Sequence, residues 1–127
     1  MDINAALAHF ESRLEWEIDA ADLHANQDAY IVIDARTPEV FAAGHVPGAI
    51  NLPHRTITAE TAQFPKDAVL VTYCDGIGCN ASTKAAVKLS RLGYRVKEMI
   101  GGLDWWRRDG LPVHNGEKVA HAVACGC

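Results

Sequence analysis

One stretch of the chain predicts a cysteine held between a buried strand and a helix. Residues 68–73 form a short apolar run rich in β-branched residues, as is typical of a buried strand. In residues 81–92 apolar side chains recur at helical spacing, and Gly93 ends the predicted helix. Cys74 opens the loop between the two elements. In open α/β sheets this position, at the carboxyl end of a strand, is where ligands bind.

The loop after Cys74 is predicted to favour a reactive thiolate. Amide groups of a tight loop and of a helix N-terminus together form a concave site for an anion. Gly76 and Gly78 are expected to take positive φ angles and to turn these amides inward. The alternative is that Cys74 is a small hydrophobic residue at the end of a strand. The surrounding loop and helix favour the reactive thiol.

The length and charge of the chain limit the domain organisation and the function classes that are open to it. With 127 residues it is expected to form one domain, with an N-terminal helix over about residues 1–15, a core over 16–113 and a tail over 114–127. A net charge of -4 argues against binding to nucleic acid, because that affinity comes mainly from Lys and Arg. No apolar run approaches the length of a membrane span, so no membrane partner is expected.

The four cysteines are interpreted through the expected compartment. The N-terminal residues are acidic and lack the basic start and apolar core of a signal peptide, which predicts a cytoplasmic protein. Thiols stay reduced in that compartment. The cysteines at positions 74, 79, 125 and 127 are therefore expected to be catalytic, redox-active or metal-binding rather than a disulfide framework.

Strands and helices are predicted to alternate along the chain. The expected fold class is α/β, with a parallel or mostly parallel sheet and helices on both faces. The first helix is expected to cover part of the core, with partner binding as the alternative. The expected helices are residues 3–14, 19–25, 35–44, 56–63, 81–92 and 101–108, and the expected strands are residues 17–18, 30–34, 49–52, 68–73 and 95–99.

Three separated motifs follow one another in a characteristic order. They are IDARTPEVFAAGHVPGAINLP (residues 33–53), Tyr73 with Cys74, and GGLDWWRRDGLPV (residues 101–113). In this order, over about residues 16–113, the chain resembles the single-domain rhodanese family of thiosulfate sulfurtransferases. The resemblance implies a rhodanese fold, with a five-stranded, mainly parallel sheet flanked by helices on both faces.

The resemblance also implies a reaction. The family's nucleophile, at the position of Cys74, takes sulfane sulfur from a donor such as thiosulfate or a persulfide. It then passes the sulfur to a thiol or to cyanide. A protein persulfide is a further expected partner, and no cofactor or metal is implied. Substrate is predicted to bind the backbone amides of the loop residues Asp75, Gly76, Ile77, Gly78, Cys79 and Asn80.

The loop departs from the commonest pattern of the family, because it is longer and contains no Arg. A longer loop resembles the related phosphatases and arsenate reductases. Those enzymes carry an Arg where Asn80 stands, which argues against phosphatase activity here. Asp75 is expected to repel anions from the nucleophile, so that thiosulfate would be a poor donor. The nearest candidate cations are Lys84, His54 and Arg55.

Two alternative functions stay open at this point. Cys79 lies five residues after Cys74 and is a candidate to resolve an oxidised Cys74 by forming a disulfide. The chain would then be a thiol-redox protein or an arsenate reductase that uses both cysteines; packing at the helix start is the structural alternative for Cys79. The other function is a non-catalytic sulfur carrier or regulatory rhodanese module. The oligomeric state is not predicted.

Other residues of the motifs favour structural roles. Asp34 and Arg36 are expected to pair or to bind loop backbone, and Glu39 suits the first turn of a helix. His45 lies in a turn, where a structural role is favoured over that of a general acid or ligand. Trp106 is expected in the core.

The C-terminal tail carries a second group of metal-type ligands. Cys125, Cys127 and His121 offer two thiolates and an imidazole for zinc or copper, or a relay for sulfur from Cys74. A fourth ligand is missing unless His114 or a second chain supplies it. The favoured interpretation is a mobile tail with reduced thiols.

Overall fold

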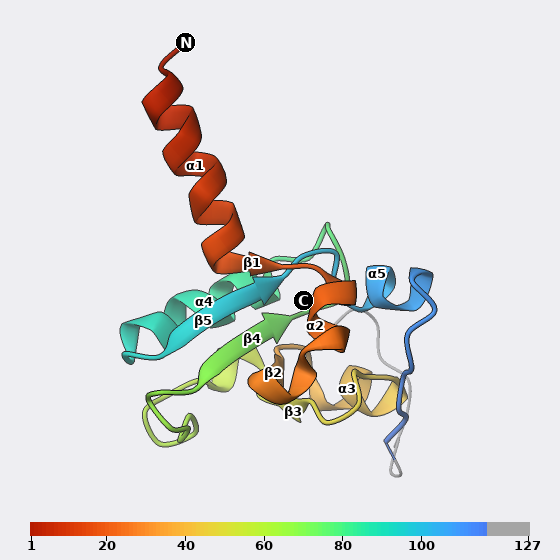
Figure 1. The fold of residues 1–127 in the computed structure, drawn as a ribbon. Coiled ribbons are helices and arrows are strands. Elements are labelled where there is room, and N and C mark those ends of the chain that lie inside the picture. The colour runs from red at the N-terminus through yellow and green to blue at the C-terminus, as the bar shows by residue number, and fades with distance from the viewer. Residues whose placement is uncertain (117–127) are drawn as a thin grey trace.

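A five-stranded parallel sheet forms the centre of the computed structural model, which describes residues 1–116 (Figure 1). The strand order is β1-β5-β4-β2-β3, and every pair of neighbours is parallel within the described residues. The strands are β1 (Glu17–Ile18), β2 (Ile31–Asp34), β3 (Ile50–Asn51), β4 (Val69–Tyr73) and β5 (Arg95–Met99). The helices are α1 (Ile3–Trp16), α2 (Ala20–Ala25), α3 (Pro38–Ala43), α4 (Ala81–Arg91) and α5 (Gly102–Arg108), with short 3-10 helices η1 (Gln27–Ala29) and η2 (His54–Thr56).

The two faces of the sheet bury separate hydrophobic clusters. Because side chains alternate along a strand, Leu70 packs with Leu89 of α4 on one face. Val71 packs with Leu23 of α2 and Trp106 of α5 on the other face. Trp106 is fully buried, which confirms its predicted place in the core. Helices therefore cover both faces, as predicted, and Cys74 follows the central strand β4.

One predicted helix is absent from the fold. Residues 56–63 were expected to be helical, but the segment continues from η2 into turns. Its threonines explain the difference, because their hydroxyls bind nearby backbone in place of the helical hydrogen bonds. Thr58 N donates to Thr61 Oγ1 at 2.8 Å, and Thr61 N donates to Thr58 Oγ1 at 3.2 Å.

The predicted packing of the first helix is also wrong. Asp2 caps α1 by accepting a hydrogen bond from Ala5 N at 3.1 Å, yet α1 buries none of its residues. It points away from the sheet (Figure 1). The apolar side chains that were expected to pack on the core are 57–81% exposed; they are Ile3, Leu7, Phe10 and Leu14. Neither α1 nor any other helix of residues 1–116 is long and apolar enough to cross a membrane.

Replacing Leu7 by Ser is expected to change the free energy of unfolding by less than about 0.5 kcal/mol, because the side chain is 57% exposed. The matched control is Leu89→Ala in α4, where the side chain is fully buried and the expected loss is about 2–5 kcal/mol. Urea unfolding followed by circular dichroism measures both changes. A loss at Leu7 as large as that at Leu89 would show that α1 is packed in solution.

Candidate active site

The register of the sheet brings three side chains from separate elements to one place. Thr72 and Cys74 point to the same face of β4, and Thr72 lies beside Glu98 of β5. Glu98 therefore lies on that face as well. This is the face that α4 covers, and the first turn of α4 supplies Ser82. The predicted position of Cys74 between a strand and a helix is confirmed.

Cys74 contacts a short chain of polar groups. Its side chain is almost fully buried, and its Sγ lies 3.3 Å from the carbonyl oxygen of Cys79 and 3.4 Å from Ser82 Oγ. Ser82 Oγ donates to Glu98 Oε2 at 2.5 Å, and Thr83 Oγ1 donates to the same oxygen at 2.7 Å. The Cys74 thiol donates to the Cys79 carbonyl oxygen, and either atom can be the donor in the contact between Cys74 Sγ and Ser82 Oγ. The sulfur thus contacts the Cys79 carbonyl group and the Ser82 hydroxyl group, and Ser82 links it to Glu98.

The active loop is held by the start of α5. Leu103 N donates to the carbonyl oxygen of Cys74 at 2.9 Å, and Asp104 N donates to that of Asp75 at 2.8 Å. These two bonds tie the loop to the first turn of α5, where unpaired amide groups are available. The position of the loop therefore depends on α5, which begins much later in the chain, after α4 and β5.

The expected backbone of the loop glycines is wrong. Gly76 and Gly78 are not among the glycines with positive φ; Gly101 and Gly102 are, with φ of 82° and 59°. The residues with left-handed backbone lie instead on the segment of Gly101 and Gly102, which faces the loop. This segment approaches the loop backbone closely, where glycine leaves room that a side chain would fill. Within the loop, Cys79 N donates to Gly76 O at 3.1 Å, so this amide already has a partner. The amide cradle stays a prediction for the rest of the loop.

A cavity of about 220 Å³ lies next to Cys74. It is bounded by the loop, the first turn of α4 and the end of β5, and Ser82 and Glu98 are among its lining residues. Of the predicted substrate-binding residues, Gly76, Ile77 and Cys79 line it, whereas Asp75, Gly78 and Asn80 do not. The candidate cations Lys84, His54 and Arg55 are not among its lining residues within the described chain.

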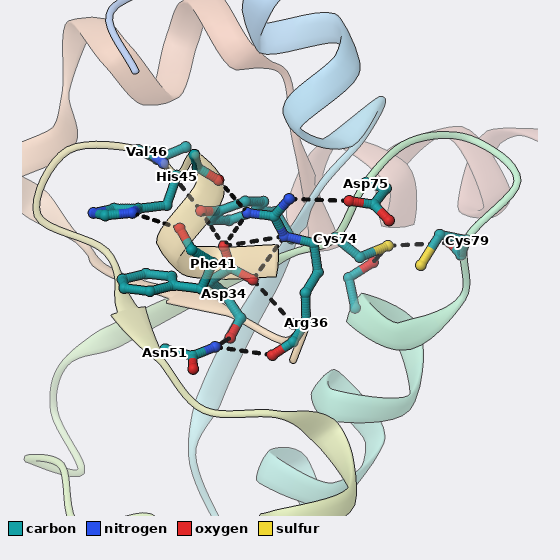
Figure 2. A network of polar contacts seen from close by, with 12 residues as sticks. Asp34, Arg36, Phe41, His45, Val46, Asn51, Cys74, Asp75 and Cys79 are labelled. Carbon is teal, nitrogen blue, oxygen red and sulfur yellow. Dashed lines mark hydrogen bonds and ion pairs between the residues drawn. The ribbon is translucent and has the colours of Figure 1, made fainter. Parts of the chain in front are cut away.

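Asp75 forms an ion pair with a buried arginine (Figure 2). Arg36 Nη1 lies 3.0 Å from Asp75 Oδ1. That Asp75 repels anions from the nucleophile stays a prediction, and its charge is paired with a cation from another loop. The carboxylate linked to Cys74 by hydrogen bonds is that of Glu98, through Ser82.

Asp34 and Arg36 form the predicted pair, and it is buried. Arg36 Nη2 lies 2.6 Å from Asp34 Oδ2, and both side chains are at most 3% exposed. Tyr73 donates its hydroxyl hydrogen to the same Asp34 oxygen at 2.6 Å. Burial acts to lower the pKa of Arg36, but its bonds to Asp34 and the charge of that carboxylate raise it above the ordinary value. Burial and Asp34 raise the pKa of Tyr73, so it stays a hydrogen donor.

Other predicted site residues have the following places. Cys74 is a free thiol, so it forms no disulfide with Cys79 in this structure. His45 Nδ1 lies 2.9 Å from the carbonyl oxygen of Phe41, and the His45 ring stacks on the Phe41 ring. Both contacts agree with a structural role for His45. Residues 1–116 contain no cluster of three His, Cys, Asp or Glu side chains suited to a metal. The tail residues Cys125, Cys127 and His121 lie outside the described residues.

Known proteins that resemble this chain agree with the fold. The Rhodanese-like domain family matches residues 18–109. The chain belongs to the rhodanese-like family. A sulfurtransferase from Allochromatium vinosum is 37% identical over 101 residues, which cover 76% of this chain and 92% of that protein. The BH2092 protein from Bacillus halodurans has a TM-score of 0.84 at 39% identity, covering 88% of this chain and 85% of the other.

A further relative of this rhodanese-like chain has a different name. The HTH-type transcriptional regulator Rv0324 from Mycobacterium tuberculosis is 35% identical over 123 residues, which cover 94% of this chain. The match spans only 54% of the regulator, so the chain corresponds to about half of that protein. Rhodanese-like sequences of this kind therefore occur in proteins named for sulfur transfer and in one named for regulation.

Ser82 and Glu98 are the site residues that sequence reasoning missed. Ser82 was not predicted as a site residue, but its side chain binds Glu98. The alternation of β5 does place Val96 and Glu98 on one face. This alternation puts an acidic residue on the apolar face of a predicted strand, near its end. Because charged residues are rare on buried faces, the pattern was sufficient to single out Glu98.

Proposed function

We propose that this rhodanese-like chain is a sulfurtransferase in which Cys74 carries the sulfur as a persulfide. The observation that carries the proposal is the free Cys74 thiol beside a small cavity at the carboxyl end of β4. The named sulfurtransferase among its relatives supports the same chemistry. Donors are sulfane-sulfur compounds such as thiosulfate or a persulfide, and acceptors are a thiol or cyanide.

Transfer takes place by two displacements at sulfur. With a persulfide donor, Cys74 Sγ attacks the outer sulfur, and a new Sγ–S bond forms as the donor's S–S bond breaks. The bonding electrons leave on the donor's inner sulfur, which takes the thiol proton. An acceptor thiol then attacks the outer sulfur of the Cys74 persulfide, and Cys74 leaves as the thiol. The two steps balance without an external oxidant or reductant.

A regulatory module is the second candidate function, favoured by the similarity to a transcriptional regulator. In that role Cys74 would take up sulfur and hold it without rapid turnover. The two candidates differ in their second step, because only the enzyme passes the sulfur to a free small acceptor repeatedly.

Replacing Cys74 by Ser is expected to lower the rate of sulfur transfer at least about a thousandfold, because the hydroxyl cannot replace the thiol as sulfur carrier. Thiocyanate formation from cyanide, with thiosulfate and with 2-hydroxyethyl persulfide as donors, measures the rate. Cys79→Ser distinguishes the proposed reaction from the redox alternative. The proposed reaction needs only the Cys74 thiol, so this variant is expected to form thiocyanate still. Activity that requires both cysteines would contradict the proposal, and a single loading without turnover would favour the regulatory module.

A further inference from the structure

The cavity beside Cys74 carries a negative charge that is built into the fold. Glu98 is the one Asp, Glu, Lys, Arg or His among the described residues that line it. Its Oε2 accepts hydrogen bonds from two hydroxyl groups, those of Ser82 and Thr83, which fix the position of the carboxylate. A half-buried carboxylate at the wall of a cavity that has no other charged lining residue within the described chain attracts a cationic ligand into that cavity.

The other acid of the loop does not share this role. Asp75 is paired with Arg36 and is not among the residues that line the cavity. Its charge is therefore offset from one side, whereas the lining residues of the cavity offer Glu98 no side-chain cation within the described chain. An anionic donor such as thiosulfate would have to approach Cys74 against the charge of Glu98.

We infer that Glu98 forms a subsite for the ammonium group of the sulfur donor, which makes an aminothiol persulfide the preferred donor class. This inference rests on the proposed sulfur transfer at Cys74. Ser82 links the sulfur to Glu98, so the carboxylate lies two hydrogen bonds from Cys74 Sγ. In a 2-aminoethyl persulfide, two carbons separate the nitrogen from the inner sulfur. A donor whose outer sulfur contacts Cys74 is thus of a size to bring its ammonium group to Glu98.

The reaction at Cys74 is the same for this donor class. The Sγ–S bond forms, the donor's S–S bond breaks, and the aminothiol leaves with the bonding electrons and the thiol proton. Glu98 stays a carboxylate throughout and acts on binding, through its charge. Its effect is therefore expected in kcat/KM and in the choice between donors.

The test compares three donors on the wild type and on Glu98→Gln: 2-aminoethyl persulfide, 2-hydroxyethyl persulfide and thiosulfate. The wild type is expected to prefer the aminoethyl donor over the neutral one by roughly fivefold or more in kcat/KM. Glu98→Gln is expected to lose this preference and to use thiosulfate roughly fivefold better. The control Glu60→Gln removes the same charge at an exposed position outside the cavity and is expected to keep the wild-type preference.

A second measurement keeps the subsite testable apart from turnover. The 2-aminoethyl and 2-sulfonatoethyl methanethiosulfonates modify thiols and differ in charge. Peptide mass spectrometry gives their relative rates at Cys74, and Glu98→Gln is expected to lower the ratio of cationic to anionic reagent roughly tenfold. An unchanged ratio, or an unchanged donor preference, would overturn the subsite. Absence of sulfur uptake from every donor with a changed reagent ratio would instead contradict the proposed function alone.

Discussion

Replacing Asp34 by Ala is expected to lower the free energy of unfolding by about 3–5 kcal/mol, because it leaves a buried guanidinium without its main partner. Arg36 is 3% exposed and lies 2.6 Å from Asp34. The variant also removes the acceptor of the Tyr73 hydroxyl hydrogen. Urea unfolding followed by tryptophan fluorescence measures the change. Asp75 does not compensate for the loss, because it contacts only one end of the guanidinium, at Nη1.

The matched control for Asp34 is an ion pair near the surface, between α1 and the start of β1. Arg13 Nε lies 3.1 Å from Glu17 Oε1, and the Arg13 side chain is 53% exposed. Arg13→Gln is expected to change the free energy of unfolding by less than about 0.5 kcal/mol, because water already solvates both charges. Equal losses in the two variants would show that burial does not determine how much the Asp34–Arg36 pair contributes to the free energy of unfolding.

Replacing Gly102 by Ala is expected to lower the free energy of unfolding by about 2–4 kcal/mol and to slow modification of Cys74 by iodoacetamide. Gly102 has φ of 59°, which strains any residue with a Cβ atom. An added Cβ would also lie 2.5 Å from Cys74 O and 2.6 Å from Gly76 N. Both neighbours are backbone atoms, so relief requires the cysteine loop to move. Thermal unfolding and the alkylation rate of Cys74 measure the two effects.

Gly78→Ala is the control for stability, since it adds the same methyl group in the cysteine loop that Gly102 approaches. No atom lies within 4 Å of a Cβ built at Gly78, and its φ is not positive. The expected change in the free energy of unfolding is less than about 0.5 kcal/mol. A loss at Gly78 equal to that at Gly102 would contradict the close approach of α5 to the loop.

Sequence periodicity predicted the helices and strands better than it predicted which of them pack against one another. The strand and helix around Cys74 follow from local patterns, and both are present. The apolar positions of α1 were identified correctly, but periodicity shows only which face of a helix is apolar. It does not show whether the rest of the chain covers that face, and here Leu7 stays exposed. Residues 56–63 failed for a local reason, since threonine hydroxyls replaced the helical hydrogen bonds.

The polar part of the site depends on register, which the sequence did not reveal. Glu98 comes close to Cys74 because β5 pairs with β4 so that Glu98 lies beside Thr72. A shift of one residue would turn Glu98 to the other face of the sheet. The direction of Asp75 is likewise set by Arg36, which follows a different strand. The nucleophile could thus be proposed from local sequence, whereas the charge around it required the three-dimensional arrangement.

Intact mass measurement after incubation with a persulfide donor tests the proposed chemistry most directly. The proposed function predicts that the wild type gains one sulfur atom, that a peptide map places it on Cys74, and that an acceptor thiol removes it. Cys74→Ser is expected to gain no sulfur at this site. Stable uptake on another residue, or no uptake from either a persulfide or thiosulfate, would contradict Cys74 as the sulfur carrier.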